Sequence, residues 1–207
     1  MKRSAWAGFL MIELLLYITF LSLDISSIIN TNWLKFASIL LVALTSLMAY
    51  RKTITTALWL TAAADVFLLP LDCCYPIGIS LFFLVQMIYS VHLHSNRGLA
   101  AQILVFITAV ILNGKTDQIA YLAIGYFIAF IINLIHAGAT AHREKTKSSR
   151  LFIAGLLLFF CCDICVGCYN VCTGAIWSFA RVAMWAFYLP GQILILWSAI
   201  SIQGEPK

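Results

Sequence analysis

The chain has 207 residues, of which 63% are hydrophobic and only 10% are charged, and its formal net charge is +5. Soluble domains carry about 25% charged residues, so this composition excludes a soluble globular domain and predicts an integral membrane protein. The positive charge informs membrane topology and gives no indication of nucleic-acid binding. The expected partners are the bilayer and its lipids, and the sequence leaves the oligomeric state open.

Eight apolar segments, separated by short polar breaks, follow one another along the chain. A helix that crosses the ~30 Å hydrocarbon core needs about 17–25 apolar residues, and several segments lie near the lower limit. The first segment follows a basic start like that of a signal peptide, but it lacks a small-residue cleavage site, so we expect a retained helix. The pattern predicts an all-α bundle of eight transmembrane helices in a single transmembrane domain over residues 1–207. The spans are expected near residues 5–29, 33–50, 54–71, 75–94, 98–113, 117–140, 151–171 and 175–201.

The positions of the basic residues support this number of spans. Lys and Arg gather in the cytoplasmic loops of membrane proteins, and eight spans place ten of the 13 basic residues on one side. Leaving out the weak fifth span would place the basic stretch 143–150 opposite the basic N-terminal residues. We therefore expect both termini in the cytoplasm and a location in the cell (cytoplasmic or inner) membrane.

The two halves of the chain suggest a weak 4+4 parallel repeat. Asp65 is followed by Tyr89, and Asp163 by Tyr188, about 24 to 25 residues later in each case. An even number of spans in each half gives both halves the same orientation.

Two of these residues are aspartates inside predicted spans, Asp65 in the third and Asp163 in the seventh. Both spans run outward from the cytoplasmic side, and at 1.5 Å per residue both carboxylates lie roughly 17 Å deep, near the bilayer midplane. An ionisable group there costs at least ~2.5–3.5 kcal/mol, so it needs a cavity, a partner or a function. The matching depths favour a functional pair over two helix-packing acids. A third acid, Glu13 in the first span, would join the same cavity or pair with Arg181.

A cysteine-rich run, CCDICVGCYN VC at residues 161–172, contains the C-x2-C-x2-C-x3-C spacing of bacterial ferredoxins. On one continuous helix these thiols lie on a single face and cannot surround an iron–sulfur cluster. We therefore interpret the cysteines as small apolar packing residues, with metal binding as the minor alternative. Cys73 and Cys74 lie at the predicted outer end of the third span, and whether they form disulfides stays open.

All four histidines lie at the predicted cytoplasmic ends of the fourth and sixth spans. This grouping admits a metal site like that of intramembrane zinc hydrolases, but interfacial histidines that contact water or headgroups are commoner. We predict neither a metal nor a cofactor. The four are His92, His94, His136 and His142.

Residues 61–90, TAAADVFLLP LDCCYPIGIS LFFLVQMIYS, resemble the first signature of the YhhN-type lysoplasmalogenase family. That signature has an aspartate in one span, then an aromatic residue, a glycine, a phenylalanine, a histidine and a tyrosine in the next. The histidine is replaced here by a glutamine, which can form hydrogen bonds but cannot titrate. The corresponding residues are Asp65, Tyr75, Gly78, Phe82, Gln86 and Tyr89.

Two later segments, GLLLFFCCDI and FYLPGQILIL, resemble the second signature of the same family. They place Asp163, Tyr188 and Gln192 at its positions, and Lys35 matches a lysine near the start of the family's second span. The resemblance covers most of the chain in order and agrees with eight spans.

The resemblance implies hydrolysis of the vinyl ether of lysoplasmalogens to a fatty aldehyde and a glycerophospho-headgroup. The catalytic residues would be Asp65 and Asp163, one as a proton donor and one as a carboxylate that stabilises the cation and activates water. Which aspartate has which role stays open. The residues expected to bind the substrate or orient water are Gln86, Tyr89, Asn170, Tyr188, Gln192 and Lys35.

Two other functions fit the same residues. Buried acids also serve small carriers or channels that couple transport to protons or cations. The third alternative is a packing or scaffold protein without chemistry.

Overall fold

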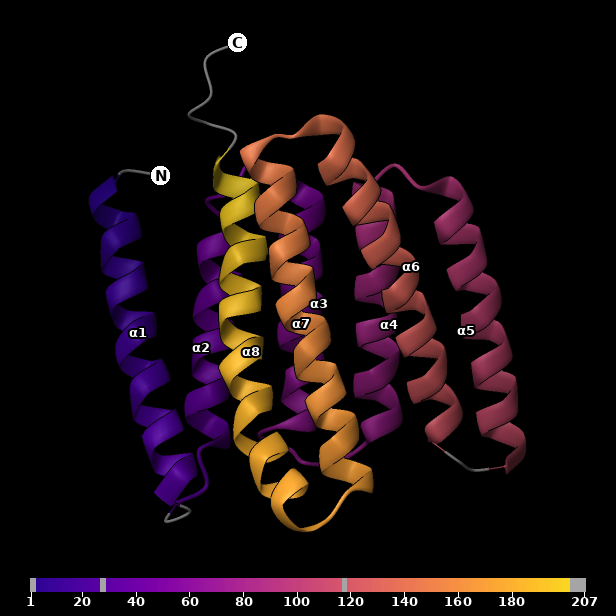
Figure 1. Ribbon diagram of the computed structural model, residues 1–207, viewed down its shortest axis with the longest axis horizontal. Coiled ribbons are helices and arrows are strands. Elements are labelled where there is room, and N and C mark those ends of the chain that lie inside the picture. Colours follow the sequence, from indigo (N-terminus) through magenta and orange to yellow (C-terminus); the bar gives the residue numbers. More distant parts are fainter. Residues whose placement is uncertain (1–2, 27–28, 117–118, 202–207) are drawn as a thin grey trace.

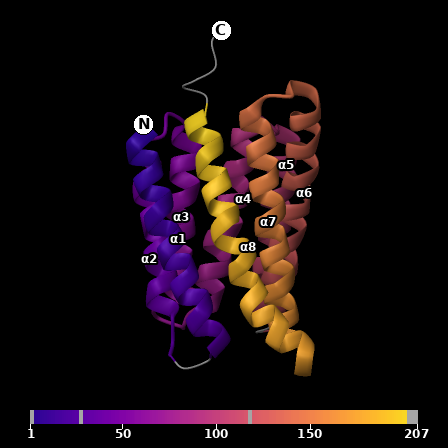
Figure 2. The same ribbon diagram turned by 60° about the vertical axis from the view of Figure 1, so that its left-hand side comes forward.

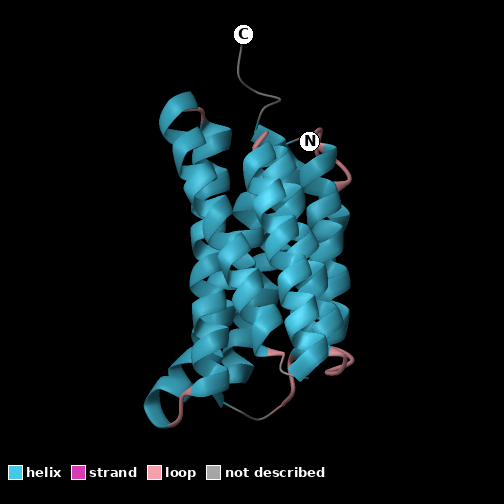
Figure 3. Cartoon of the chain, turned by 90° about the vertical axis from the view of Figure 1, so that its right-hand side faces the viewer, coloured by secondary structure: helices cyan, strands magenta, loops and turns pink. Residues whose placement is uncertain are grey.

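The computed structural model describes residues 3–26, 29–116 and 119–201. These residues form eight α-helices at the positions of the eight predicted segments, with ends that differ by a few residues, and the described residues contain no strand (Figure 1; Figure 3). The helices are α1 (Arg3–Ser26), α2 (Asn32–Ser46), α3 (Lys52–Leu68), α4 (Tyr75–His92), α5 (Asn96–Thr116), α6 (Ala120–Glu144), α7 (Lys147–Val171) and α8 (Gly174–Ile200).

The helices run up and down as one bundle, with α1 at one edge and α5 at the other (Figure 1). We call the end at which α1 begins and α8 ends the near end, and the opposite end the far end. In Figure 2, α8 crosses the bundle obliquely between the α1–α2 side and the α7 side. The helix α3 packs against α2, α4 and α8, so other helices surround it.

Six of the described helices, α1 and α4 to α8, are long and apolar enough to cross a membrane. Their outer faces carry large apolar side chains; for example, Leu104 is 67% exposed and Ile135 is 65% exposed. Such a surface suits lipid rather than water, and the chain is therefore a multi-pass helical membrane protein. The helices α2, with 15 residues, and α3, with 17, are shorter, so eight spans and cytoplasmic termini stay predictions.

The helices α7 and α8 approach one another most closely at two glycines. A Cβ atom added to Gly155 of α7 would lie 2.8 Å from the carbonyl oxygen of Gly191 in α8. Only glycine permits this backbone contact, and small residues commonly have this role where membrane helices cross. The contact joins the helix that carries Asp163 to the helix that carries Tyr188.

A proline interrupts the hydrogen bonding of α8 one turn after Ala186. Pro190 has no N–H group, so it cannot donate to the carbonyl of Ala186, as a residue four positions later in a helix normally does. The hydroxyl of Tyr17 in α1 donates to this carbonyl instead, at 3.1 Å. A buried backbone oxygen thus gains a partner, and α1 is attached to α8 close to Tyr188.

An aromatic cluster fills the centre of the bundle between four helices. The ring of Phe159 in α7 lies 5.8 Å from Phe82, 5.0 Å from Phe130 and 5.4 Å from Tyr188, measured between ring centroids. Packing of this kind restricts rotamers, and it fixes the position of Tyr188 beside α7.

Candidate active site

Each of the two predicted aspartates accepts a hydrogen bond from a tyrosine on another helix. The hydroxyl of Tyr188 in α8 donates to Oδ2 of Asp65 in α3 at 2.6 Å. The hydroxyl of Tyr126 in α6 donates to Oδ2 of Asp163 in α7, also at 2.6 Å. These distances are at the short end of the range for O–H···O bonds. Four helices therefore meet in two aspartate–tyrosine pairs.

The two pairs belong to one site. The carboxyl groups of Asp65 and Asp163 are near enough to interact electrostatically, and Cys162 lies beside both. The hydroxyls of Tyr126 and Tyr188 are also near enough to interact electrostatically. Carboxylic acids placed together like this can divide the work of proton donor and base.

Burial distinguishes the two carboxyl groups. Asp65 is 3% exposed, and its partner Tyr188 is 4% exposed. Asp163 is only partly buried by the neighbouring helices. Along the helices, Asp65 lies one turn before the end of α3 and Asp163 two turns before the end of α7. The site thus lies in the far half of the bundle.

Gln86, which stands where the family has histidine, lies behind the second pair. Its side-chain oxygen accepts a hydrogen bond from Nδ2 of Asn133 at 2.8 Å, and its amide lies near the hydroxyl of Tyr126. Ser90 donates to Oδ1 of Asn133 at 2.8 Å. Nε2 of Gln86 has no hydrogen-bond partner among the described residues, so Gln86 is held by Asn133 and lies near Tyr126 without a hydrogen bond to it.

Sequence reasoning missed Tyr126 and Asn133. The signal was present, because both are polar groups two turns apart on one face of the apolar helix α6. The sequence could not show which aspartate these residues contact, because that depends on how α6 packs against α4 and α7.

Three predicted binding residues, Gln86, Tyr89 and Gln192, are buried with unpaired polar atoms. Gln192, one turn after Tyr188, has no hydrogen-bond partner for either amide atom among the described residues, and neither has the hydroxyl of Tyr89. Thr61, one turn before Asp65, is in the same situation. An unsatisfied buried polar group costs about 1–3 kcal/mol, so these groups mark positions where water or a bound molecule would be stabilised.

Lys35 lies at the far-end side of the first pair. Its ammonium is 2.7 Å from Oδ2 of Asp24 and 4.8 Å from the ring centroid of Trp185. The ring of Trp185 is in turn 5.3 Å from that of Tyr188. Lys35 is thus connected to Asp65 through two aromatic residues, and its partner Asp24 was not anticipated.

Asn170 and Glu13 lie elsewhere. The exposed Asn170 donates to the carbonyl of Val166 in its own helix, at 2.8 Å, so it does not contact either aspartate. Glu13 is 1% exposed and lies beside Ser38 of α2. Neither of its oxygens has a hydrogen-bond partner in the described part of the chain, so the expected hydrogen-bonded pairing with Arg181 is not formed.

The cysteine run is part of the continuous helix α7 up to Val171, Cys172 is the extended residue that follows the helix, and all seven cysteines are free thiols. Cys162 and Cys165 are buried, as small packing residues would be. No three His, Cys, Asp or Glu side chains of the described residues come together as a metal site would require. The structure therefore offers no geometry for the iron–sulfur or histidine-metal alternatives.

The fold and the site together define a class: a multi-pass helical membrane protein with two tyrosine-bonded carboxyl groups inside the bundle. The sequence profile of the YhhN family matches residues 30–199, so the chain belongs to the YhhN family. The matched range includes both aspartate–tyrosine pairs and Lys35, whereas Glu13 and Asp24 precede it. The comparisons with curated proteins and with solved structures found no match.

Proposed function

We propose that this protein is a membrane-embedded hydrolase that cleaves the vinyl-ether bond of lysoplasmalogen-type lysophospholipids. The products are a fatty aldehyde and a glycerophospho-headgroup. The observation that carries the proposal is the joining of Asp65 and Asp163, each bonded to a tyrosine at 2.6 Å, in one site. Membership of the YhhN family supports it.

The reaction needs an acid and a base that act in succession. A proton added to the alkenyl carbon next to the ether-bearing carbon produces an oxocarbenium ion. Water then attacks this ion while a carboxylate removes one of its protons, and the resulting hemiacetal collapses to an aldehyde and an alcohol. Glycosidases stabilise the same kind of cation with two carboxyl groups.

We assign the two roles from how completely other helices enclose each carboxyl group. The base must meet the attacking water, and Asp163 is the less enclosed of the two carboxyl groups. The proton donor needs contact with the substrate alone, which suits the enclosed Asp65. Tyr188 and Tyr126 hold the two groups at fixed positions, as preorganised catalysis requires.

The substrate would enter with its apolar chain along the lipid-facing helices and its polar end toward the far end. Lys35 lies at that end, next to Trp185, and its ammonium would have to leave Asp24 to meet the phosphate. The unpaired amide of Gln192, one turn from Tyr188, would bond the glycerol or the attacking water. We expect this reaction in the cell membrane, and the proposed chemistry uses no cofactor.

The test is aldehyde release from a lysoplasmalogen by the full chain purified in detergent. We expect Asp65→Asn and Asp163→Asn each to abolish the reaction, because the amide can neither donate the proton nor accept one. Asp72→Asn is the matched control, since Asp72 is exposed and its left-handed φ of 47° suits asparagine.

Aldehyde release that survives both substitutions would exclude the two-carboxyl mechanism. If the vinyl ether stays intact while proteoliposomes show proton-coupled uptake, the carrier or channel alternative replaces the hydrolase.

A further inference from the structure

A second polar site lies at the near end of the bundle, where α4 ends, α5 begins and α6 ends. Side chains there surround a hollow of about 480 Å³, which we call the basic pocket. It lies at the opposite end from Asp65, so it is separate from the proposed active site. Its polar lining includes His94, Asn96, Arg97, His136, Thr140 and Arg143.

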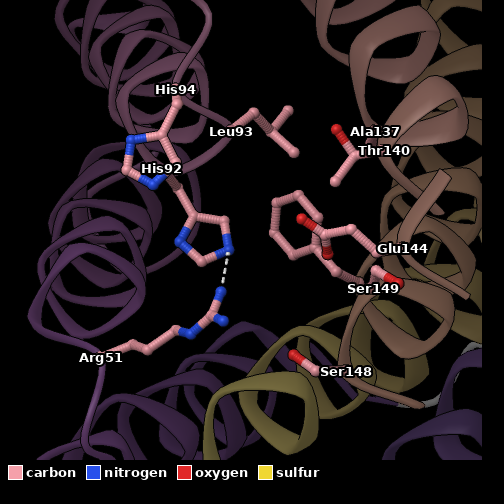
Figure 4. Close-up of a pocket in the computed structure, with 10 residues that line it drawn as sticks. Arg51, His92, Leu93, His94, Ala137, Thr140, Glu144, Ser148 and Ser149 are labelled. Atoms are coloured by element: carbon pink, nitrogen blue, oxygen red, sulfur yellow. Dashed lines mark hydrogen bonds between the residues drawn. The ribbon is translucent and has the colours of Figure 1, made fainter. Parts of the chain in front are cut away.

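The basic pocket carries positive charge without a compensating acid. Arg97 and Arg143 line it, and none of its described lining residues is Asp or Glu. A hollow that adjoins it, drawn in Figure 4, differs in this respect. There Arg51 donates to Nε2 of His92 at 3.0 Å and interacts with Glu144. Of these two hollows, the basic pocket is the one whose described lining contains basic side chains and no acid.

The backbone brings the basic side chains together. A Cβ atom added to Gly98 would lie 3.0 Å from Cε1 of His136, so glycine allows the start of α5 to approach α6. His94, at a left-handed φ of 52°, turns the chain from α4 into α5. Nδ1 of His136 is 2.8 Å from the carbonyl of Ile132 and donates to it, so Nε2 is the ring nitrogen left for a ligand.

We propose that the basic pocket binds a phosphate-bearing anion. Two guanidinium groups match phosphate oxygens by forming paired N–H···O bonds, and the lining offers hydroxyl and amide groups as further donors. The volume exceeds that of one phosphate group, so an attached group also fits. The ligand is either the headgroup of a phosphate-bearing lipid or a soluble phosphate ester. The proposal does not depend on the proposed hydrolase activity.

Binding is measured with the full chain in neutral detergent, by thermal unfolding at constant ionic strength. The probes are phosphatidic acid in mixed micelles, with phosphatidylcholine as its control, and glycerol phosphate in solution, with chloride as its control. We expect saturable stabilisation by one of the phosphate probes. Stabilisation by phosphatidic acid alone identifies a lipid headgroup, and stabilisation by glycerol phosphate identifies a soluble ligand.

Variants locate the site. Arg97→Gln and Arg143→Gln should each weaken binding about tenfold or more, because each removes charge-assisted hydrogen bonds. Arg97→Lys keeps the charge but not the paired bonds, so it should bind less tightly than wild type while remaining folded. The control pair, Lys52→Gln and Arg150→Gln, removes the same charge from exposed positions outside the pocket.

Two results would overturn the proposal. One is an equal loss of affinity in the pocket variants and the control pair, which would mean that general positive charge attracts the anion. The other is stabilisation by phosphate probes that does not exceed that of their controls.

Discussion

The two aspartate–tyrosine pairs have the same geometry in different surroundings. Both bonds are 2.6 Å long. Asp65 and Tyr188 are enclosed by other helices, whereas Asp163 is only partly enclosed. Water can replace a lost protein partner only where it has access. Equal hydrogen-bond distances therefore do not mean that the two aspartates depend equally on their tyrosines. We expect substitutions in the enclosed pair to reduce activity more.

The largest expected effects come from removing each carboxyl group and supplying a substitute. Asp65→Ala and Asp163→Ala should each reduce aldehyde release by at least 10²–10⁴-fold, the usual contribution of an acid or a base. Added formate should restore part of the activity of Asp163→Ala, because that position is the less enclosed of the two, and none of Asp65→Ala. Equal rescue of both variants would contradict the difference in access.

Removing the tyrosine hydroxyls should have a smaller and unequal effect. Tyr188→Phe leaves the enclosed Asp65 without its donor, and we expect kcat/KM to fall about 10- to 100-fold, the equivalent of one hydrogen bond to a charged group. Tyr126→Phe leaves Asp163 free to bond water, so its loss should stay below about tenfold. The fall in kcat/KM of both variants is measured from the kinetics of aldehyde release. A larger fall for Tyr126→Phe would reverse the order that we expect for the two pairs.

The polar chain behind the second pair can be broken without touching either aspartate. Asn133→Leu removes the donor to Gln86 and the acceptor of Ser90, both buried. The free energy of unfolding should fall by about 2 kcal/mol, with a smaller loss for Ser90→Ala. Denaturant unfolding in detergent tests this order. A larger loss of unfolding free energy for Ser90→Ala would show that Asn133 is not the central member of this hydrogen-bonded group.

The smallest effect concerns the attachment of α1 near the first pair. Tyr17→Phe deprives the carbonyl of Ala186 of its donor, and we expect a loss of about 1 kcal/mol in unfolding free energy. In a Pro190→Ala background the restored N–H supplies that donor, so the same substitution should cost less. Additive effects in this double-mutant cycle would mean that Tyr17 does not compensate for the proline.

Local sequence patterns were sufficient to predict the helices and part of the candidate site. Apolar segments between polar breaks predicted all eight helices, because in lipid the backbone must satisfy its hydrogen bonds within each segment. The same reasoning predicted one helical face for the cysteine run, and α7 is continuous through it as far as Val171, whereas Cys172 lies just beyond the helix. Asp65 and Asp163 could be identified as candidates because a carboxyl group inside an apolar membrane helix is energetically costly and is usually functional.

Tertiary structure alone decided what these residues contact. Tyr126 donates a hydrogen bond to Asp163, Asn133 donates one to Gln86, and Lys35 pairs with Asp24. These contacts depend on which faces of distant helices meet. Asn170 shows the limit of a helical wheel, because it lies on the side of Asp163 but bonds its own backbone. A sequence determines the period and polarity of each helix, whereas partners across helices follow from side-chain packing between segments far apart in the chain.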